Sequence, residues 1–289
     1  MASEIITSRD NKWLKSFRSA LQGAGPKESE PIGVEGRKLV EDAITSGLDV
    51  RALLVSETGE RELPHILEAA SDSEEGIPRS RIFRTTDKLF AGVSGTESPQ
   101  GLAALFRQPI WGLEDTLRGP ARPDGSYRVA NFPLIAVLTA IQDPGNAGTI
   151  IRSAEAFGAT GAIATRGTAD PWSPKALRAS AGSALRLPLL RGLAVPVVLA
   201  QLRISGVKII AASSHQKAQA IDHALLRECL HGPAAIFVGS EGAGLPAEVE
   251  HSADARIAIP MSASVESLNA GVAASILLYE TAKLRSDGV

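Results

Sequence analysis

Apolar and polar residues alternate in short blocks along the second half of the chain. Apolar runs of strand length are followed, at regular intervals, by segments with helical spacing. Strands that are almost continuously apolar are typical of a parallel sheet with helices on both faces, which binds its ligand in the loops after the strands. We expect strands at 134–141, 161–165, 207–213, 234–239 and 255–260, and helices at 149–157, 174–184, 195–204, 221–230 and 268–284.

The first half of the chain has a mixed pattern that predicts a small α/β domain. The predicted helices are 11–22, 37–46, 63–70 and 87–91, and the predicted strands are 31–35, 52–56, 81–84 and 101–106. Between the halves, residues 119–126 are GPARPDGS, and 111–131 show no clean period. We therefore predict domains at 1–110 and 132–289, joined by a linker at 111–131.

The composition indicates a folded globular protein. Hydrophobic residues make up 44% and charged residues 21% of the 289 residues, a balance that argues against extended disorder. No apolar run approaches the roughly 20 residues that cross a bilayer, so no membrane protein is expected. Cys229 is the single cysteine, and the first residues lack the pattern of a secretory signal, which predicts a cytoplasmic protein. The five histidines lack ligand spacing, so we expect no metal.

The first candidate loop, 142–148, follows the predicted strand that ends at Ile141. Its two glycines and its proline shape a tight backbone path, and Asn146 offers both a donor and an acceptor there. Arg152 is expected on the first turn of the next helix, near the rim of the loop, where it can reach a phosphate or a ribose. A plain turn followed by a solvated arginine explains the same residues equally well.

The second candidate loop, 239–246, is rich in glycine around Glu241. The glycines let the backbone approach a ligand closely, and a carboxylate suits donor groups better than an anion. The loop matches neither the GxGxxG fingerprint nor the GxxxxGK[ST] fingerprint, so it does not indicate a nucleoside triphosphate. A glycine-rich surface turn is the alternative interpretation.

The third candidate loop joins Ile259-Pro260-Met261 to the last predicted helix. Ser267 or Asn269 can cap that helix, which is the usual role of such residues. Ile259, Met261 and Leu268 offer apolar walls for a flat heterocycle, whereas in the alternative they are ordinary core residues. Each loop is ambiguous alone, but all three lie where a parallel sheet places its ligand.

Together the three loops resemble the motifs of the SpoU/TrmH family of S-adenosylmethionine-dependent RNA 2′-O-ribose methyltransferases, in the SPOUT superfamily. The family's motifs are Asn-x-Gly with a later Arg, a glycine-rich loop with a central Glu, and Ile-Pro-Met followed by Ser-Leu-Asn. The matching residues are, in that order, Asn146, Gly148 and Arg152, then Gly239, Glu241 and Gly244, then 259–261 and 267–269. The resemblance implies a parallel α/β sheet with a deep trefoil knot, a rare exception to the rule against threaded chains. It also implies a homodimer.

The resemblance also implies roles for individual residues. S-adenosylmethionine would lie inside the knot, in contact with Ser213, Gly239, Gly244, Ile259, Met261 and Leu268. Arg152 would be the catalytic residue, either as a base through unusual pairing or as a cation that holds a phosphate and stabilises the developing alkoxide. Asn146 would position the ribose or Arg152, and Glu241 would orient Arg152 or a substrate donor. Ser267 and Asn269 would close the site.

The first half of the chain resembles the ribosomal-protein-like RNA-binding domain that precedes the catalytic domain in many family members, through Glu35-Gly36-Arg37 and the following helix. Because such a domain accompanies rRNA modification, rRNA is expected rather than tRNA. The net charge of −2 requires local basic patches for RNA. The residues predicted to contact phosphates are Arg37, Lys38, Lys175, Arg178 and Arg186.

Several alternatives stay open at this point. Each basic cluster is also explained as a solvated helix face. The substrate can be tRNA, and knotted relatives modify a base nitrogen of tRNA instead of a ribose. A non-catalytic RNA-binding protein that keeps the fold is the alternative of a different class.

Overall fold

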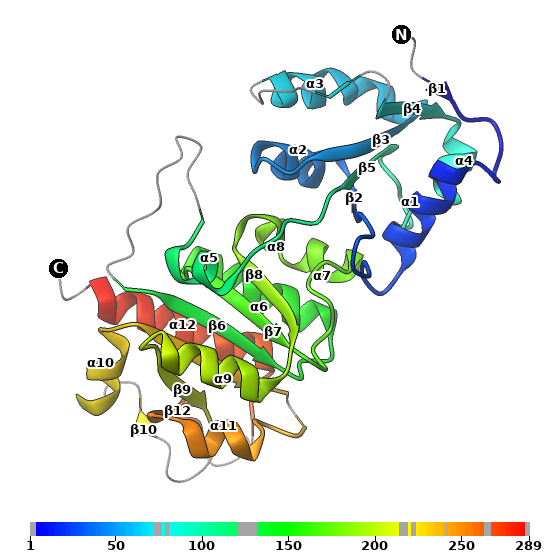
Figure 1. Ribbon diagram of the computed structural model, residues 1–289. Coiled ribbons are helices and arrows are strands. Elements are labelled where there is room, and N and C mark those ends of the chain that lie inside the picture. The colour runs from blue at the N-terminus through cyan, green and yellow to red at the C-terminus, as the bar shows by residue number, and fades with distance from the viewer. Residues whose placement is uncertain are drawn as a thin grey trace. The chain divides into compact units, whose positions relative to one another are not determined.

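The computed structural model describes residues 4–71, 77–78, 81–120, 132–213, 219–220, 224–240, 242–262 and 267–286. They form two compact units, each with its own sheet (Figure 1). The first unit is Met1–Ile110 with Trp172–Arg186, and the second is Trp111–Pro171 with Leu187–Val289. Of the predicted linker, residues 121–131 lie outside the described residues, and the part before them contains helix α5 (Leu113–Arg118).

The first unit contains a five-stranded sheet and has the small α/β fold that the sequence pattern predicts. Its strands lie in the order β1 (Glu4–Ile5), β4 (Ile82–Thr85), β3 (Val50–Ser56), β5 (Leu102–Phe106) and β2 (Ile32–Glu35). Its helices include α1 (Lys12–Gln22), α2 (Arg37–Thr45), η1 (Thr58–Arg61), α3 (Leu63–Ser71) and α4 (Asp87–Ala91). Leu14, Phe17 and Leu21 share one face of α1 and are buried in the core of this unit.

Two short helices replace the single helix predicted over 174–184, so that prediction is wrong. α7 (Pro174–Ala179) and α8 (Ser183–Arg186) both belong to the first unit. Between them, Ala181 and Gly182 have φ angles of 47° and 82°. This left-handed backbone conformation ends α7 because a right-handed helix cannot continue through it.

The second unit contains a sheet of seven parallel strands, which confirms the parallel sheet expected from the apolar runs. Across the sheet, the strands are β10 (Gln219–Ala220), β12 (Ala255–Ala258), β9 (Lys208–Ala212), β11 (Ala234–Gly239), β6 (Leu134–Thr139), β7 (Gly161–Thr165) and β8 (Leu189–Leu193). The sequence pattern missed β8 because this partly exposed edge strand, LLRGL, includes an arginine and a glycine.

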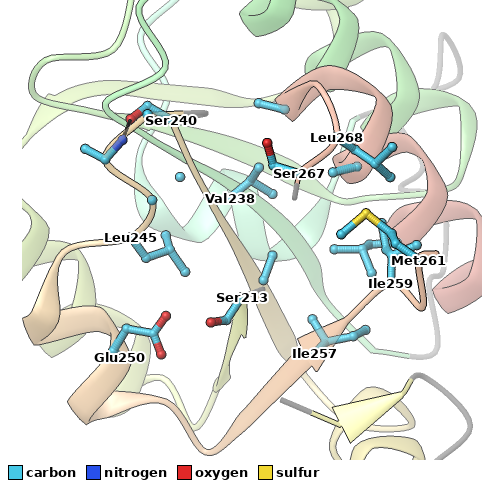
Figure 2. Close-up of a pocket in the computed structure, with 18 residues that line it drawn as sticks. Ser213, Val238, Ser240, Leu245, Glu250, Ile257, Ile259, Met261, Ser267 and Leu268 are labelled. Atoms are coloured by element: carbon cyan, nitrogen blue, oxygen red, sulfur yellow. Dashed lines mark hydrogen bonds between the residues drawn. The ribbon is translucent and has the colours of Figure 1, made fainter. Parts of the chain in front are cut away.

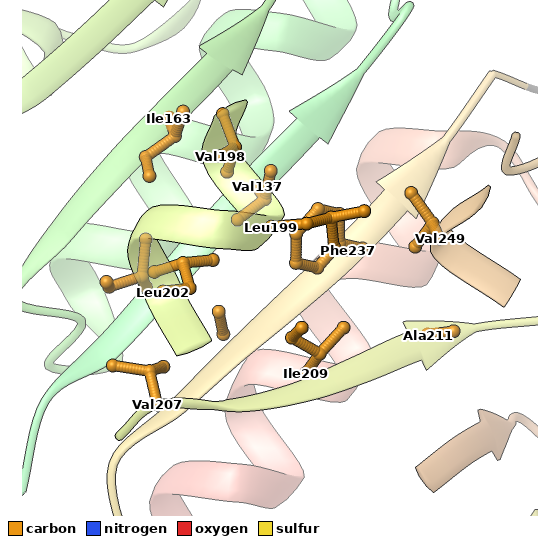
Figure 3. Packing of buried hydrophobic residues seen from close by; sticks show 12 residues of the cluster. Val137, Ile163, Val198, Leu199, Leu202, Val207, Ile209, Ala211, Phe237 and Val249 are labelled. Atoms are coloured by element: carbon orange, nitrogen blue, oxygen red, sulfur yellow. The ribbon is translucent and has the colours of Figure 1, made fainter. Parts of the chain in front are cut away.

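Helices cover both faces of the parallel sheet (Figure 1). One face packs against α5, α9 (Val195–Ile204) and α11 (Ala247–Ser252), and the other against α6 (Pro144–Ala156), α10 (Ala224–Leu230) and α12 (Ala270–Ser286). Figure 3 shows the first of these layers, where Val198 and Leu202 of α9 lie against Val137 and Phe237 of the central strands. Because both faces are buried, the central strands have no polar face, and their sequences are continuously apolar.

One arginine holds the last turn of α12. The Arg285 guanidinium donates hydrogen bonds of 2.6–3.2 Å to the carbonyl oxygens of Phe132, Pro133, Leu230 and Gly232. Burial lowers the pKa of Arg285 to about 10, so the side chain stays protonated at neutral pH and can satisfy all of these acceptors. Helix α12 is thereby fixed at one end to the segments that lead into β6 and β11.

Candidate active site

The loops after β6, β11 and β12 leave the parallel sheet at the same edge. Thr139 at the end of β6 pairs with Gly239 at the end of β11, and Ile257 of β12 pairs with Ala212 of β9. A cavity of ≈ 320 Å³ lies at this edge (Figure 2). Its position and size are those of a small-molecule site in a parallel α/β sheet.

All residues predicted to contact the cofactor line this cavity, and Ser267 lines it as well. The predicted set is Ser213, Gly239, Gly244, Ile259, Met261 and Leu268. Figure 2 shows Ile259, Met261 and Leu268 together on one side of the cavity, with Ser240 and Leu245 on the other. An apolar wall therefore faces a glycine-rich loop.

The glycine-rich loop folds tightly onto itself. The Gly244 N–H donates to the Ser240 carbonyl at 2.9 Å, and Gly244 has a φ of +66°. A Cβ atom on Gly239 would lie 2.2 Å from the Gly244 carbonyl oxygen, so this loop geometry requires glycine at 239. Glu241, predicted to orient a donor, lies outside the described residues.

Helix α6 begins at Pro144, so the prediction of a loop through Gly148 is wrong. The Asp143 carboxylate caps the helix by accepting from the Gly145 and Asn146 N–H groups, and proline is favoured at the first helical position. Asn146 therefore lies on the first turn, and Arg152 lies two turns later rather than on that turn. Six helical residues correspond to a rotation of about 240°, so Asn146 and Arg152 point to different sides of α6.

Asn269 joins the first and third motifs. Its Nδ2 donates to Oδ1 of Asn146 at 3.0 Å, and its Oδ1 accepts from the Val272 N–H at 3.2 Å. The same side chain therefore caps α12 and contacts α6. This bears out the expected capping role and brings two of the predicted catalytic residues together. A second link between these helices is the 2.7 Å hydrogen bond between Ser153 and Ser275.

Arg152 is exposed on α6 and forms no hydrogen bond or ion pair with another described residue. Its guanidinium is therefore available to an external anion. No described acidic side chain forms an ion pair with Arg152 that could help it act as a base.

Glu250 lines the cavity but belongs to none of the three motifs. It lies on α11, and Figure 2 shows its carboxylate directed toward the cavity. Arg256 Nε donates to one of its carboxylate oxygens at 3.1 Å. Sequence reasoning missed Glu250 because nothing local to α11 indicates that this turn faces the ends of β9 and β12.

The basic residues predicted to contact RNA all belong to the first unit. Lys38 and Arg186 share Asp42, at 2.9 and 3.6 Å, and Arg37 lies 3.4 Å from Glu62. The hydrogen bond and charge of Asp42 raise the pKa of Lys38. The remaining two residues, Lys175 and Arg178, are exposed on α7. Together with Lys38, whose side chain is 80% exposed, they are the exposed members of the set and can be reached by a phosphate backbone.

The cavity fits S-adenosylmethionine chemically. Among the described residues that line it, none is basic, so the lining does not favour a phosphate. The apolar wall can hold a flat heterocycle, the glycine-rich loop offers backbone donors and acceptors, and Glu250 suits hydroxyl, amine or cationic groups.

Two other features are absent from the described residues. No three His, Cys, Asp or Glu side chains come together there in a way that could hold a metal ion. None of the helices in the described ranges is long and apolar enough to span a membrane.

Family comparisons agree with the cavity and its loops. Residues 133–279 match the SpoU rRNA Methylase family, and residues 24–104 match the MRM3-like substrate binding domain. The chain belongs to the SpoU rRNA methylase family. The resemblance inferred from the three loops is thereby confirmed, whereas the trefoil knot stays a prediction.

Individual relatives cover nearly the whole chain. The chain is 30% identical to 23S rRNA (guanosine(2553)-2′-O)-methyltransferase RlmP of Bacillus subtilis, over 95% of this chain and 97% of that protein. An AdoMet-bound rRNA methyltransferase from Sinorhizobium meliloti superposes with a TM-score of 0.78 at 26% identity, covering 97% of this chain and 98% of the other. The SpoU methyltransferase AviRb from Streptomyces viridochromogenes, in complex with AdoMet, superposes with a TM-score of 0.75 at 26% identity, covering 96% of this chain and 100% of the other.

Proposed function

We propose that this protein transfers a methyl group from S-adenosylmethionine to a ribose 2′-hydroxyl of rRNA. The observation that carries the proposal is the cavity at the strand ends, where the second and third motifs form the walls and Asn269 joins the third motif to Asn146 of the first. The relative from Bacillus subtilis acts on 23S rRNA by its name, and residues 24–104 match a substrate-binding domain. The name of the Bacillus subtilis relative supports rRNA over tRNA.

The proposed cofactor site is the cavity itself. When bound, S-adenosylmethionine supplies a methyl group on a cationic sulfur. Ile259, Met261 and Leu268 would enclose its heterocycle, while the backbone of Gly239 and Gly244 and the nearby Ser213 would provide polar contacts.

In the proposed mechanism the protein aligns the ribose and compensates charge. Arg152 would hold a phosphate of the RNA and stabilise the alkoxide that develops at the 2′-oxygen, because it is an exposed cation with no acidic partner among the described residues. Asn146, fixed by Asn269, would position the ribose, and Ser267 would close the site above the cavity. Glu241 would orient Arg152 or a substrate donor.

The RNA would be held by basic residues of the first unit. Lys175 and Arg178 are exposed on α7, where a phosphate can reach them. The other members of the set, which form ion pairs within this unit, are Arg37, Lys38 and Arg186. We also propose that the protein works in the cytoplasm.

A homodimer would form through α12 and its neighbour α6. Val272, Ile276 and Tyr279, spaced by four and three residues, share one face of α12 and are 46%, 37% and 51% exposed. Phe157 packs edge-on against Tyr279, with ring centroids 5.5 Å apart. An exposed apolar face on the helix that follows the third motif supports a second copy of the chain as its partner.

Replacing Ile276 by Glu tests this dimer. We expect Ile276→Glu to yield monomers in sedimentation velocity and to abolish methyl transfer. Ile204→Glu on α9 is the matched control, because Ile204 is also exposed, at 88%, but lies on a helix of the opposite face. Dimers of Ile276→Glu with full activity would refute the proposed interface.

The activity test uses rRNA fragments and tRNA transcripts with labelled S-adenosylmethionine, followed by nucleoside analysis. A 2′-O-methyl nucleoside in rRNA is the expected product. A methylated ribose in tRNA would show that tRNA is the substrate, and a methylated base nitrogen would show that the protein is a base methyltransferase. RNA binding without any product would indicate a non-catalytic protein.

Cofactor binding is tested by calorimetry on Gly239→Ala. A Cβ at 239 collides with backbone, so we expect affinity for S-adenosylmethionine to fall at least about 10-fold as the loop opens. Gly232→Ala serves as the control because a Cβ there meets nothing within 4 Å. If Gly239→Ala binds S-adenosylmethionine with unchanged affinity, the cofactor does not bind at this loop.

A further inference from the structure

Among the described residues that line the cavity, Glu250 is the charged one. Its side chain is 19% exposed, and Figure 2 shows the carboxylate directed toward the cavity from the side where Ser213 and Leu245 lie. A carboxylate that is largely buried at the wall of a cavity requires partners, because an unpaired charge there is costly.

Only one of the two carboxylate oxygens of Glu250 has a partner among the described residues. Oε2 accepts from Arg256 Nε at 3.1 Å, and the guanidinium also donates to the Glu250 carbonyl oxygen, which fixes the arginine against α11. Oε1 accepts no hydrogen bond from the described residues. Arg256 therefore holds the carboxylate in place while one oxygen remains for a ligand.

The position of Glu250 determines which part of the ligand its carboxylate can contact. The apolar wall of Ile259, Met261 and Leu268 lies on the other side of the cavity and suits the heterocycle. The group covalently joined to the heterocycle is the ribose, which carries two adjacent hydroxyl donors. A carboxylate is purely an acceptor, so a ribose hydroxyl complements its open oxygen.

We propose that Glu250 accepts a hydrogen bond from a ribose hydroxyl of the bound cofactor and thereby fixes the adenosyl group, with Arg256 as a positioning residue. This inference rests on the proposed function, because it assigns a contact within the proposed cofactor site.

The test is calorimetry with S-adenosylhomocysteine and its 2′-deoxy and 3′-deoxy analogues. S-adenosylhomocysteine lacks the sulfonium charge, so general attraction between that charge and a carboxylate does not contribute. In the wild-type protein, removal of the contacted hydroxyl should weaken binding about 10- to 100-fold. Glu250→Ala should weaken binding of S-adenosylhomocysteine by a similar factor and should show no further loss with the deoxy analogue.

Matched variants separate this contact from a structural role. Glu250→Gln keeps the side-chain size and a neutral acceptor, so we expect an intermediate loss. Glu248→Ala, exposed on the same helix, should bind like the wild type. Arg256→Met should weaken binding less than Glu250→Ala. The Glu250→Ala loss should persist with 5′-methylthioadenosine, which keeps the ribose but lacks the amino-acid group.

The outcomes separate a failure of the whole cofactor site from a failure of the Glu250 contact alone. A wild-type protein that binds neither S-adenosylmethionine nor S-adenosylhomocysteine overturns the proposed function and this contact with it. Wild-type binding with an unaffected Glu250→Ala overturns the contact alone. The contact is also overturned if Glu250→Ala still discriminates against both deoxy analogues as the wild type does, because a merely structural role leaves that discrimination unchanged.

Discussion

Two carboxylates of the first unit and one arginine of the second unit differ in how far their charges are satisfied within the chain. In the first unit, the Asp87 carboxylate accepts hydrogen bonds from Ser56 and Thr58, and Glu35 accepts from the Ser94 and Thr96 hydroxyls at 2.6 and 2.8 Å. In the second unit, Arg152 has no partner among the described residues. These first-unit carboxylates are satisfied within the chain, whereas Arg152 is an exposed cation on α6 that pairs with no described residue.

From this difference we expect two kinds of residue, those that stabilise the fold and those that can bind a ligand. A carboxylate surrounded by its own donors fixes a loop and has little left to offer a partner. An exposed or cavity-facing charge without a partner contributes little to stability and is available for binding. We call a charged group without a partner in the chain, such as Arg152, an open group, and one satisfied by its own donors, such as Asp87 or Glu35, a closed group. A change in an open group should affect activity more than stability, and a change in a closed group should affect stability more than activity.

The largest expected effect is that of Arg152→Ala on methyl transfer. Because Arg152 is exposed and forms no hydrogen bond or ion pair with a described residue, its removal should leave the thermal midpoint and the affinity for S-adenosylmethionine unchanged. Loss of a cation that stabilises the developing alkoxide should lower kcat about 10²- to 10³-fold. Single-turnover transfer together with calorimetry measures both quantities.

Arg227→Ala is the control for this experiment, since Arg227 is likewise exposed in the second unit, on α10. Transfer by Arg152→Ala at the wild-type rate would refute the catalytic assignment. A large fall in its thermal midpoint would instead indicate that the comparison between open and closed groups is wrong.

Asn269 lies between these extremes because it both caps α12 and fixes Asn146. Asn269→Ala should remove both contacts, lowering stability by about 1 kcal/mol and transfer about 10-fold or more. Asn269→Asp keeps an acceptor for the Val272 N–H but has no donor for Asn146. It should therefore retain the thermal midpoint and still lose transfer, and equal losses of both in the two variants would contradict this division.

The parallel fold was predictable from the sequence because burial on both faces makes each strand apolar along its whole length, and this pattern is visible locally. Strands such as β6 and β11 are apolar throughout, and no long-range information is needed to recognise them. The start of α6 is also visible in the sequence, since Asp143-Pro144 is a favourable cap and first residue, but the glycines that follow favour a loop and obscure it. The break at Ala181 and Gly182 has a weaker signal, because alanine itself favours helix.

The cavity was only partly predictable for a physical reason. Gly239, Ile259 and Leu268 belong to motifs with fixed spacing, so the sequence pointed to them directly. Glu250 reaches the cavity only because α11 packs beside β9 and β12, and that placement depends on contacts between segments far apart in the chain. The pairing of Lys38 and Arg186 with one acid, Asp42, is similarly a tertiary result.

The smallest expected effect belongs to Asp87, a closed group of the first unit. The hydrogen bond from Ser56, followed by those from the Thr58 backbone and hydroxyl, lowers the pKa of Asp87 below its usual value of 3.8. A carboxyl group whose pKa is lower in the folded state stabilises the fold above its unfolded pKa, and this contribution disappears as the pH falls through the folded pKa. Asp87→Asn should therefore lower the thermal midpoint of the first unit at pH 7 by about 1–3 °C.

That decrease should shrink as the pH falls below about 4, because the wild-type carboxyl then becomes protonated as well. Asp10→Asn is the control, since the Asp10 side chain is 91% exposed and pairs only with Lys15 among the described residues, at 3.3 Å. Methyl transfer should remain at the wild-type level at pH 7, because Asp87 faces its own loop rather than a ligand. If Asp87→Asn lost methyl transfer but kept its stability, Asp87 would behave like Arg152, and the expected difference between these carboxylates and Arg152 would be refuted.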